Sequence, residues 1–350
     1  MENVGAEEGP SGAVTIGRYP GQGKPRATRG ERMRFVDVLA RSVDHSSMVS
    51  MAGLSAALGG AIVSGARLGQ HMRLRVKTRA YTDSQGRATP YLELGEPVLG
   101  TLVWLHGFGD RPDTFLPTAA SLAKDYRILI PALPGFSGWL DQRERHTFDA
   151  YVGWLEGVLL DIAGPRFHLM GNSLGGAITL SLAGRMKDRV ITAIPVNSSG
   201  VKLLGVDCVG GEMSRGENLF EVRSRPEYDA FVARVFSRPP KLPRSIQDFL
   251  YREQTKNADW YRRVVGDLIA SPPVRETDEA SEYVDLSAIG VPTLVVWGEH
   301  DTLFPLAHAR YLEERIAGAE QRVIQRCGHC PHLERPAELA RAFREFAERR

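Results

Sequence analysis

Residues 167–176 read Phe-His-Leu-Met-Gly-Asn-Ser-Leu-Gly-Gly, an apolar run that passes through Gly-x-Ser-x-Gly into a stretch with helical character. This pattern predicts a β-strand, a very tight turn and an α-helix, with Ser173 in a strained backbone conformation at the turn. Larger side chains at Gly171 and Gly175 would collide there. The Ser173 hydroxyl would stand at a helix N-terminus, where amides and the helix dipole stabilise an oxyanion. The segment therefore predicts a nucleophilic serine.

Outward from this segment, short apolar runs alternate with helical patterns from about residue 72 to the C-terminus. Such alternation predicts an α/β fold with a mostly parallel sheet and helices on both faces. We expect residues 72–198 and 284–350 to form this core, and residues 199–283 to form a helical cap over it. The expected strands are residues 73–77, 91–94, 101–105, 126–131, 167–170, 190–196, 293–297 and 321–324.

Two later strand ends supply partners for the serine. A serine hydroxyl is a weak nucleophile at neutral pH and needs a general base that an acid orients. Asp301 follows the apolar run 293–297, and His329 follows the run 321–324, in the order acid and then histidine. Because catalytic groups gather at the carboxyl ends of parallel strands, we expect Ser173, Asp301 and His329 to meet as a catalytic triad.

The loop after the expected strand 101–105 reads His106-Gly107-Phe108-Gly109. A loop in this position completes an oxyanion hole together with the amide that follows the nucleophile, so Phe108 and Leu174 are the expected donors. We expect His106 to organise this loop rather than to act as a second base. The expected substrate pocket is formed by His106, Gly107, Asn172, Phe231 and Phe236.

From about residue 72 onward the chain resembles serine hydrolases of the α/β-hydrolase fold, and among them bacterial lipases and esterases of the monoacylglycerol-lipase-like group. The resemblance rests on the residue 106–109 loop, on the tight turn at residues 171–176, called the nucleophile elbow, and on three further motifs: Pro134-Gly135-Phe136, Gly298-Glu299-His300-Asp301 and Gly328-His329-Cys330-Pro331. It implies a carboxylic ester hydrolase with a cap, which acts on a small lipophilic ester by two-step acyl transfer. It implies no metal and no organic cofactor.

Two other functions remain open within this fold. Carbon–carbon bond hydrolases of meta-cleavage diketones share the Gly-Asn-Ser-x-Gly-Gly elbow and the triad, but they need a polar cap that holds a dienoate. An arginine directly over Ser173 would favour them, and the cap contains Arg223, Arg225, Arg234 and Arg238. The other function is that of a non-enzymatic ligand-binding member of the fold.

Cys327 and Cys330 flank His329 with the spacing of a redox pair. Such a pair stands near the start of a thioredoxin-like fold, whereas here one predicted helix follows it. A zinc site formed by both cysteines and His332 lacks a separate second half-site. We therefore expect neither a redox nor a metal site.

Composition excludes some partners. The 350 residues contain 44 lysines and arginines against 42 acids, a net charge of +2, so no nucleic-acid partner is expected. Three cysteines cannot form a disulfide framework, and the cytoplasm is the expected location.

The N-terminal region is expected to have two parts. Residues 1–44 are rich in Gly, Pro, Arg and Glu and should be disordered. Residues 45–71 should form an amphipathic helical segment, because Met51, Leu54, Leu58 and Ile62 have helical spacing. A helix with this stripe should dock on protein or on a bilayer surface rather than span a bilayer. With the arginines between residues 18 and 34, it predicts peripheral membrane contact through residues 18–66.

Overall fold

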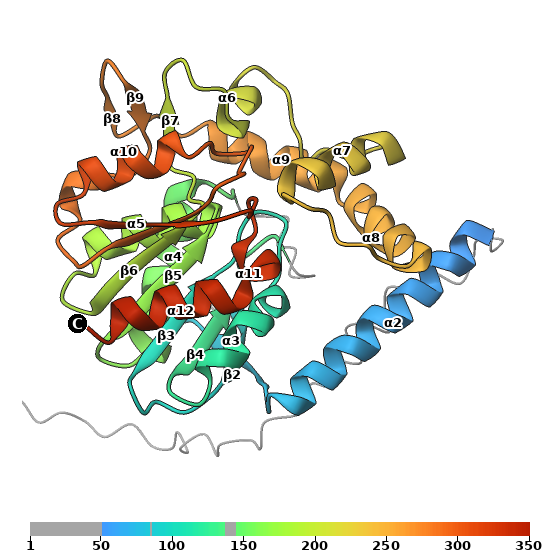
Figure 1. The fold of residues 1–350 in the computed structure, drawn as a ribbon, viewed down its shortest axis with the longest axis horizontal. Helices are drawn as coiled ribbons and strands as arrows, with labels where there is room; N and C mark the ends of the chain where they lie inside the picture. The colour runs from blue at the N-terminus through green and yellow to red at the C-terminus, as the bar shows by residue number, and fades with distance from the viewer. Residues whose placement is uncertain (1–50, 85, 137–144) are drawn as a thin grey trace, which may run out of the picture. The chain divides into compact units, whose positions relative to one another are not determined.

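The structure, a computed structural model, describes residues 51–84, 86–136 and 145–350 (Figure 1). Within these residues the main sheet has eight strands in the order β1-β2-β4-β3-β5-β6-β10-β11. β2 is antiparallel to β1 and β4, and the remaining neighbours are parallel. The bounds are β1 (Lys77–Thr82), β2 (Ala88–Leu94), β3 (Thr101–Leu105), β4 (Arg127–Pro131), β5 (Phe167–Asn172), β6 (Val190–Val196), β10 (Leu294–Gly298) and β11 (Glu320–Ile324).

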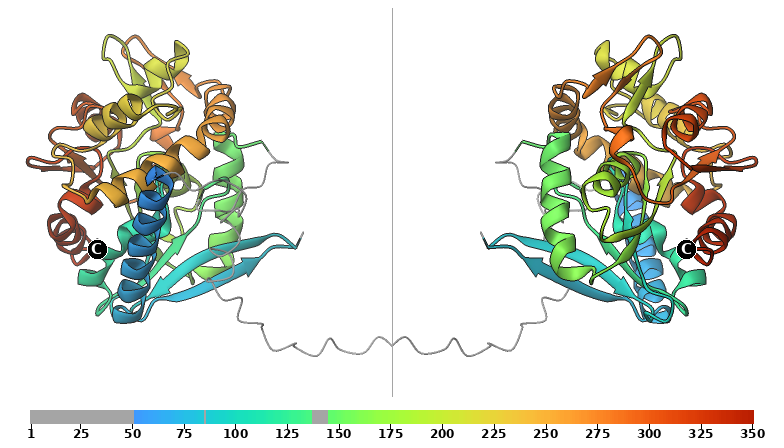
Figure 2. Two further views of the ribbon diagram at one scale, coloured as in Figure 1. Left: turned by 90° about the vertical axis from the view of Figure 1, so that its right-hand side faces the viewer. Right: turned by 90° about the vertical axis from the view of Figure 1, so that its left-hand side faces the viewer.

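Helices cover both faces of this sheet, as Figure 2 shows. Alternate residues of β3 enter two apolar cores, with Leu102 and Trp104 in one and Val103 and Leu105 in the other. The 3-10 turn η1 and helices α3 and α12 pack in the first core, and α4, α5 and α10 pack in the second. The predicted α/β fold with a mostly parallel sheet is confirmed. The bounds are η1 (Pro112–Phe115), α3 (Leu116–Leu122), α4 (Phe148–Ile162), α5 (Leu174–Arg185), α10 (Ala307–Arg315) and α12 (Pro336–Ala347).

The chain between β6 and β10 holds the elements of the expected cap. Its helices are α6 (Val209–Ser214), α7 (Arg225–Val235), α8 (Arg244–Lys256) and α9 (Ala258–Ile269). A three-stranded antiparallel sheet, in the order β7-β9-β8, lies in the same interval and is absent from the sequence-based expectation. Its strands have only two or three residues, too few to show an alternating pattern. They are β7 (Val201–Leu203), β8 (Arg275–Glu276) and β9 (Ala280–Glu282).

Helix α2 (Met51–Arg73) precedes the core and packs against α8. Its small residues Ala56 and Gly59 are buried, and Ser55 Oγ donates a 2.8 Å hydrogen bond to Asp248 Oδ2 of α8. α2 agrees with the expected helical segment, of which residues 45–50 lie outside the described residues, as does the expected disordered segment 1–44. Because α2 extends to Arg73, the strand expected over residues 73–77 is wrong.

The large apolar side chains of α2 point away from α8. Leu54, Leu58 and Ile62 are 60%, 59% and 43% exposed, and Leu68 and Met72 are exposed on the same face. We call these five residues the α2 stripe. The small residues of the opposite face make the contact with α8, so the helix packs on its own protein, as one of the expected alternatives has it, but through another face than the predicted stripe. None of the described helices is long and apolar enough to cross a membrane.

Candidate active site

Ser173 occupies the tight turn between β5 and α5. Its backbone has φ 57° and ψ −118°, a conformation that a residue with a side chain adopts only under strain. A Cβ on Gly171 would overlap the Gly175 carbonyl, and a Cβ on Gly175 would overlap the Leu105 carbonyl. The two glycines therefore permit the close approach of strand and helix that holds Ser173 in this turn.

His329 and Asp301 lie in loops that follow β11 and β10. His329 Nδ1 is 2.9 Å from Asp301 Oδ2, and both side chains are buried. The backbone amides of Leu303 and Phe304 donate to Asp301 Oδ1 over 2.8 and 3.2 Å. These donors fix the carboxylate, so it accepts the Nδ1–H and leaves Nε2 of His329 as the basic nitrogen.

Asn197, directly after β6, is a member of this site that the sequence analysis missed. Its Nδ2 donates to Asp301 Oδ2 over 2.6 Å, and its Oδ1 accepts from the Gly298 amide over 3.2 Å. The side chain is fully buried and the backbone has φ 44°, which asparagine tolerates better than most residues. The one sequence signal is its position at the carboxyl end of a predicted parallel strand.

Ser173 and His329 line one cavity. Among the described residues no hydrogen bond joins the Ser173 hydroxyl to His329. Asn172, expected in the pocket, lines the same cavity and also braces the histidine loop, because its Nδ2 donates to the His329 carbonyl over 3.1 Å. The second bond of this amide, to the Val196 carbonyl over 3.2 Å, ties the loop to the end of β6.

The two expected oxyanion donors lie beside Ser173. Leu174 is the first residue of α5, so its amide has no partner within the helix. Among the described residues, no backbone carbonyl accepts a hydrogen bond from the amide of Leu174 or of Phe108. The preceding residue, Gly107, is so close that a Cβ there would lie 3.1 Å from the Ser173 Cβ. Both amides are therefore available to an oxygen bound near Ser173.

His106 is fully buried and lines neither of the cavities described below. Its Nδ1 is 2.9 Å from the Gly107 carbonyl, and its Nε2 accepts from the Leu133 amide over 2.9 Å. Burial lowers the pKa of His106, so the ring stays neutral. Its expected place in the pocket is not observed, because both ring nitrogens are engaged in holding the loop.

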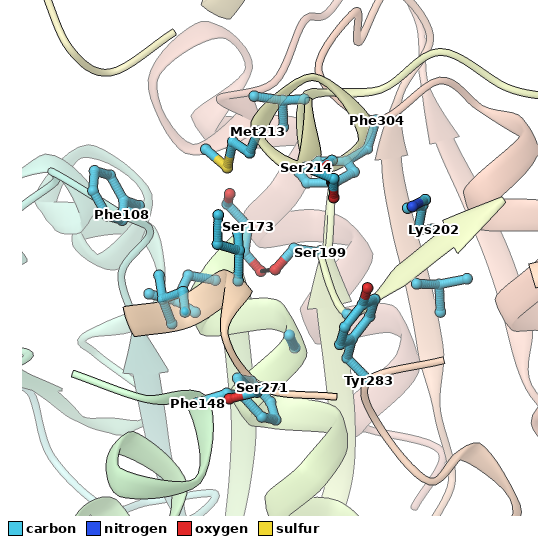
Figure 3. A pocket seen from close by; sticks show the side chains of 18 of the residues that line it. Phe108, Phe148, Ser173, Ser199, Lys202, Met213, Ser214, Ser271, Tyr283 and Phe304 are labelled. Carbon is cyan, nitrogen blue, oxygen red and sulfur yellow. Dashed lines mark hydrogen bonds between the residues drawn. The ribbon is translucent and has the colours of Figure 1, made fainter. Parts of the chain in front are cut away.

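Two cavities meet at Ser173, and Phe108 and Phe220 line both of them. The first has a volume of about 180 Å³, and its wall is mostly apolar. Figure 3 shows Ser173 among Phe108, Met213 and Ser199 in this cavity. Its other apolar lining residues include Phe148, Leu174, Ala177, Val201, Val209, Leu268 and Phe304.

The second cavity, of about 270 Å³, contains His329 in its wall, whereas the first does not. The expected pocket residues Gly107, Asn172, Phe231 and Phe236 line this second cavity. Its wall also carries polar and charged side chains, among them Arg67, Asp110, Arg111, Thr114, Glu253 and Asn257.

Comparison with known families decides where this chain belongs. A sequence model of the Alpha/beta hydrolase family matches residues 102–342. The chain belongs to the alpha/beta hydrolase family. The matched region contains the elbow, the histidine–aspartate pair and both candidate oxyanion donors of this hydrolase, whereas α2 and β1 lie before it.

Curated relatives of this hydrolase include Lipase 1 of Psychrobacter immobilis, 25% identical over 78% of this chain and 86% of the relative. The 2-hydroxy-6-oxo-2,4-heptadienoate hydrolase of Pseudomonas putida is 25% identical over 72% of this chain and 89% of the relative. A solved membrane phospholipase A shares the fold with a TM-score of 0.75, at 23% identity over 89% of this chain and 96% of that one. The predicted resemblance to lipases and esterases, and with it the prediction of a hydrolase, is confirmed.

The cysteines beside His329 are free thiols in this hydrolase. Burial raises the pKa of both the Cys327 and the Cys330 thiol. A thiolate is the reactive form of a redox cysteine, and burial disfavours it here. Both thiols are therefore held in their less reactive protonated form.

Proposed function

We propose that this hydrolase cleaves lipophilic carboxylic esters through a triad of Ser173, His329 and Asp301. One observation carries the proposal: the strained elbow serine lines a cavity together with a histidine that a buried carboxylate holds at 2.9 Å. A histidine oriented in this way can take the proton of a serine hydroxyl that is otherwise a poor nucleophile.

In the first step the Ser173 Oγ attacks the ester carbonyl carbon, and its proton moves to His329 Nε2. The amides of Phe108 and Leu174 bind the resulting oxyanion, and Asp301 stabilises the imidazolium. The intermediate then collapses, the C–O bond to the alcohol breaks, and His329 gives its proton to the departing alcohol. In the second step His329 takes a proton from water as the water oxygen attacks the acyl carbon, the bond from this carbon to Ser173 Oγ then breaks, and His329 returns the proton to Ser173 Oγ as the carboxylic acid leaves.

The first cavity is the proposed acyl-chain site. Its apolar wall begins at Ser173 and includes Met213 of α6 and Leu268 of α9. Transfer of a chain from water to such a wall contributes about 0.8 kcal/mol per buried methylene. A lipophilic acyl group therefore fits this cavity better than a polar one does.

Carbon–carbon bond cleavage is the second candidate, since one relative is named as a heptadienoate hydrolase. The cap arginines do not support it, whereas Arg67 and Arg111, which lie outside the cap, line the second cavity together with Ser173. Arg223, Arg225 and Arg234 form ion pairs with carboxylates of the cap, and neither these three nor Arg238 lines either cavity.

The α2 stripe adds a peripheral membrane contact to the proposal. Its five apolar side chains are exposed on one face of α2, and the exposed cations Arg73, Arg75 and Lys77 follow at the end of the helix. The attraction of each such cation to anionic headgroups is worth about 1 kcal/mol at best. The apolar side chains of the stripe would enter the boundary between the headgroups and the acyl chains of the lipids. We therefore propose that the α2 stripe lies on an anionic bilayer surface, where lipophilic esters gather.

The test is a hydrolysis panel with purified protein and with Ser173→Ala as the blank. It contains p-nitrophenyl esters, monoacylglycerols and a meta-cleavage dienoate, and a fluorophosphonate probe reports the reactive serine. We expect hydrolysis of the esters and labelling of Ser173. Turnover of the dienoate alone would replace ester hydrolysis by carbon–carbon cleavage, and absence of both labelling and turnover would favour a binding protein.

A further inference from the structure

Helix α2 is fixed at both ends against elements that surround the second cavity. Near its start Ser55 is bound to Asp248, and near its end His71 Nε2 lies 2.6 Å from Asp113 Oδ1 of η1. Arg67, one turn before His71, therefore has a defined position, and its side chain lines the second cavity. A helix outside the region that matches the family thus contributes to the cavity that holds Ser173 and His329.

Arg67 meets a second guanidinium there, that of Arg111. Among the described residues neither guanidinium forms an ion pair or a side-chain hydrogen bond. Two of the neighbouring carboxylates are engaged elsewhere, Asp113 by His71 and Asp110 by the Thr114 hydroxyl at 2.9 Å. Within the described residues neither guanidinium is directly paired although both are partly buried, while the charges of Asp113, Glu253 and Asp110 act on Arg67 through space.

Burial, and then the charge of Arg111, lower the pKa of Arg67 to about 10 against the opposite effect of Asp113, Glu253 and Asp110, so Arg67 remains cationic at neutral pH. The two like charges repel each other, and an anion bound between them would add direct hydrogen bonds that the nearby carboxylates do not supply. Arginine is suited to this, because its planar fork binds a phosphate or carboxylate through paired hydrogen bonds. Glu253 lines the same cavity without an ion pair to either arginine, so it does not neutralise the pair by direct contact.

The position of His329 indicates which part of the ester this cavity receives. In the proposed mechanism His329 must reach the oxygen of the departing alcohol. His329 lines the second cavity and not the first, so the alcohol side of the ester belongs in the second cavity. The acyl chain then occupies the apolar first cavity.

We propose that Arg67 and Arg111 bind an anionic group, a phosphate or a carboxylate, on the alcohol part of the ester. The inference rests on the proposed ester hydrolysis for the direction in which the substrate lies. The preferred substrates are then acyl esters of alcohols that carry a phosphate or a carboxylate, rather than of neutral alcohols.

The test compares three esters with one acyl chain: hexanoylglycerol, hexanoylglycerol phosphate and O-hexanoyl lactate. Their kcat/KM values are measured for the wild type, Arg67→Gln, Arg111→Gln and Arg252→Gln, the last being a control because Arg252 is exposed on α8 and lines neither cavity. We expect the wild type to favour an anionic ester, and the anionic-to-neutral ratio to fall by about tenfold or more in Arg67→Gln and Arg111→Gln. The ratio should not change in Arg252→Gln. The phosphate and lactate arms show which anion is bound.

Binding of glycerol 3-phosphate and of lactate, followed by calorimetry, separates this inference from the proposed function. Binding that Arg67→Gln or Arg111→Gln weakens, without hydrolysis of any ester, would uphold the anion site and overturn ester hydrolysis. A wild-type ratio of one or less, or a ratio and anion binding that neither variant changes, would overturn the anion site. Thermal melting identifies a variant that fails to fold. If either Arg67→Gln or Arg111→Gln fails to fold, the comparison is made with the other variant.

Discussion

Asn197 allows the candidate triad to be tested without replacing any of its members. Its Nδ2 donates over 2.6 Å to Asp301 Oδ2, so Asn197→Ala leaves this oxygen with His329 as its remaining side-chain partner. A hydrogen bond to a charged group contributes about 1.5–3 kcal/mol. If all of it is felt in the transition state, kcat/KM falls by about 10- to 150-fold. Because Asn197 has φ 44°, alanine also adds about 1 kcal/mol of backbone strain, which lowers the melting temperature.

The assay is kcat/KM on a soluble p-nitrophenyl ester, with thermal melting in parallel. Thr192→Val is the matched control, because it removes a buried hydrogen bond between Thr192 Oγ1 and His168 Nδ1, 2.8 Å apart, and Thr192 lines neither cavity. Both variants should have a lower melting temperature than the wild type, but only Asn197→Ala should lose activity. Activity within about twofold of the wild type in Asn197→Ala, or an equal loss in Thr192→Val, would refute the argument that this amide orients Asp301.

The triad should behave as a unit. Ser173→Ala and His329→Ala should each lower kcat by about 10⁴-fold or more, and Asp301→Asn should lower it somewhat less. The Ser173→Ala/His329→Ala double variant should lower kcat little beyond either single variant. Near-native esterase activity of Ser173→Ala would contradict the mechanism. Met213→Trp, which fills part of the first cavity, should shift preference towards shorter acyl chains across a p-nitrophenyl ester series, and an unchanged profile would place the acyl chain elsewhere. Replacing the leucines and the isoleucine of the α2 stripe by serine should reduce co-sedimentation with anionic liposomes, with a melting temperature close to that of the wild type. Equal sedimentation would exclude the membrane contact.

The sequence predicts best those features that depend on neighbouring residues. The apolar run 190–196 is found as β6 with the same bounds. The elbow is equally local, because contacts among Gly171, Gly175 and Leu105 permit no Cβ at either glycine. Residues 73–77, Arg-Leu-Arg-Val-Lys, show why a short pattern misleads. Five alternating residues predict a strand, but they also fit the last residues of a helix and the turn that follows it.

Features that depend on distant contacts are not visible in the sequence. Asn197 is separated from Asp301 by 104 positions, and it acquires its role only because β6 and β10 are neighbours in the sheet. A single asparagine after a strand carries no such information. The position of Arg67 in the wall of the second cavity cannot be predicted for the same reason, since nothing in the sequence shows that α2 lies against α8.

The chemistry and the selectivity of this hydrolase are therefore built from different parts of the chain. The groups proposed to perform the reaction lie on loops and turns of the core sheet, within the region that matches the family. Helix α2 lies outside that region, and it carries the α2 stripe on one face and Arg67 on another. Removing the N-terminal region to test membrane binding would also remove Arg67 and the contact with α8. Point substitutions on the two faces of α2 are needed to separate binding at a lipid surface from recognition of the ester.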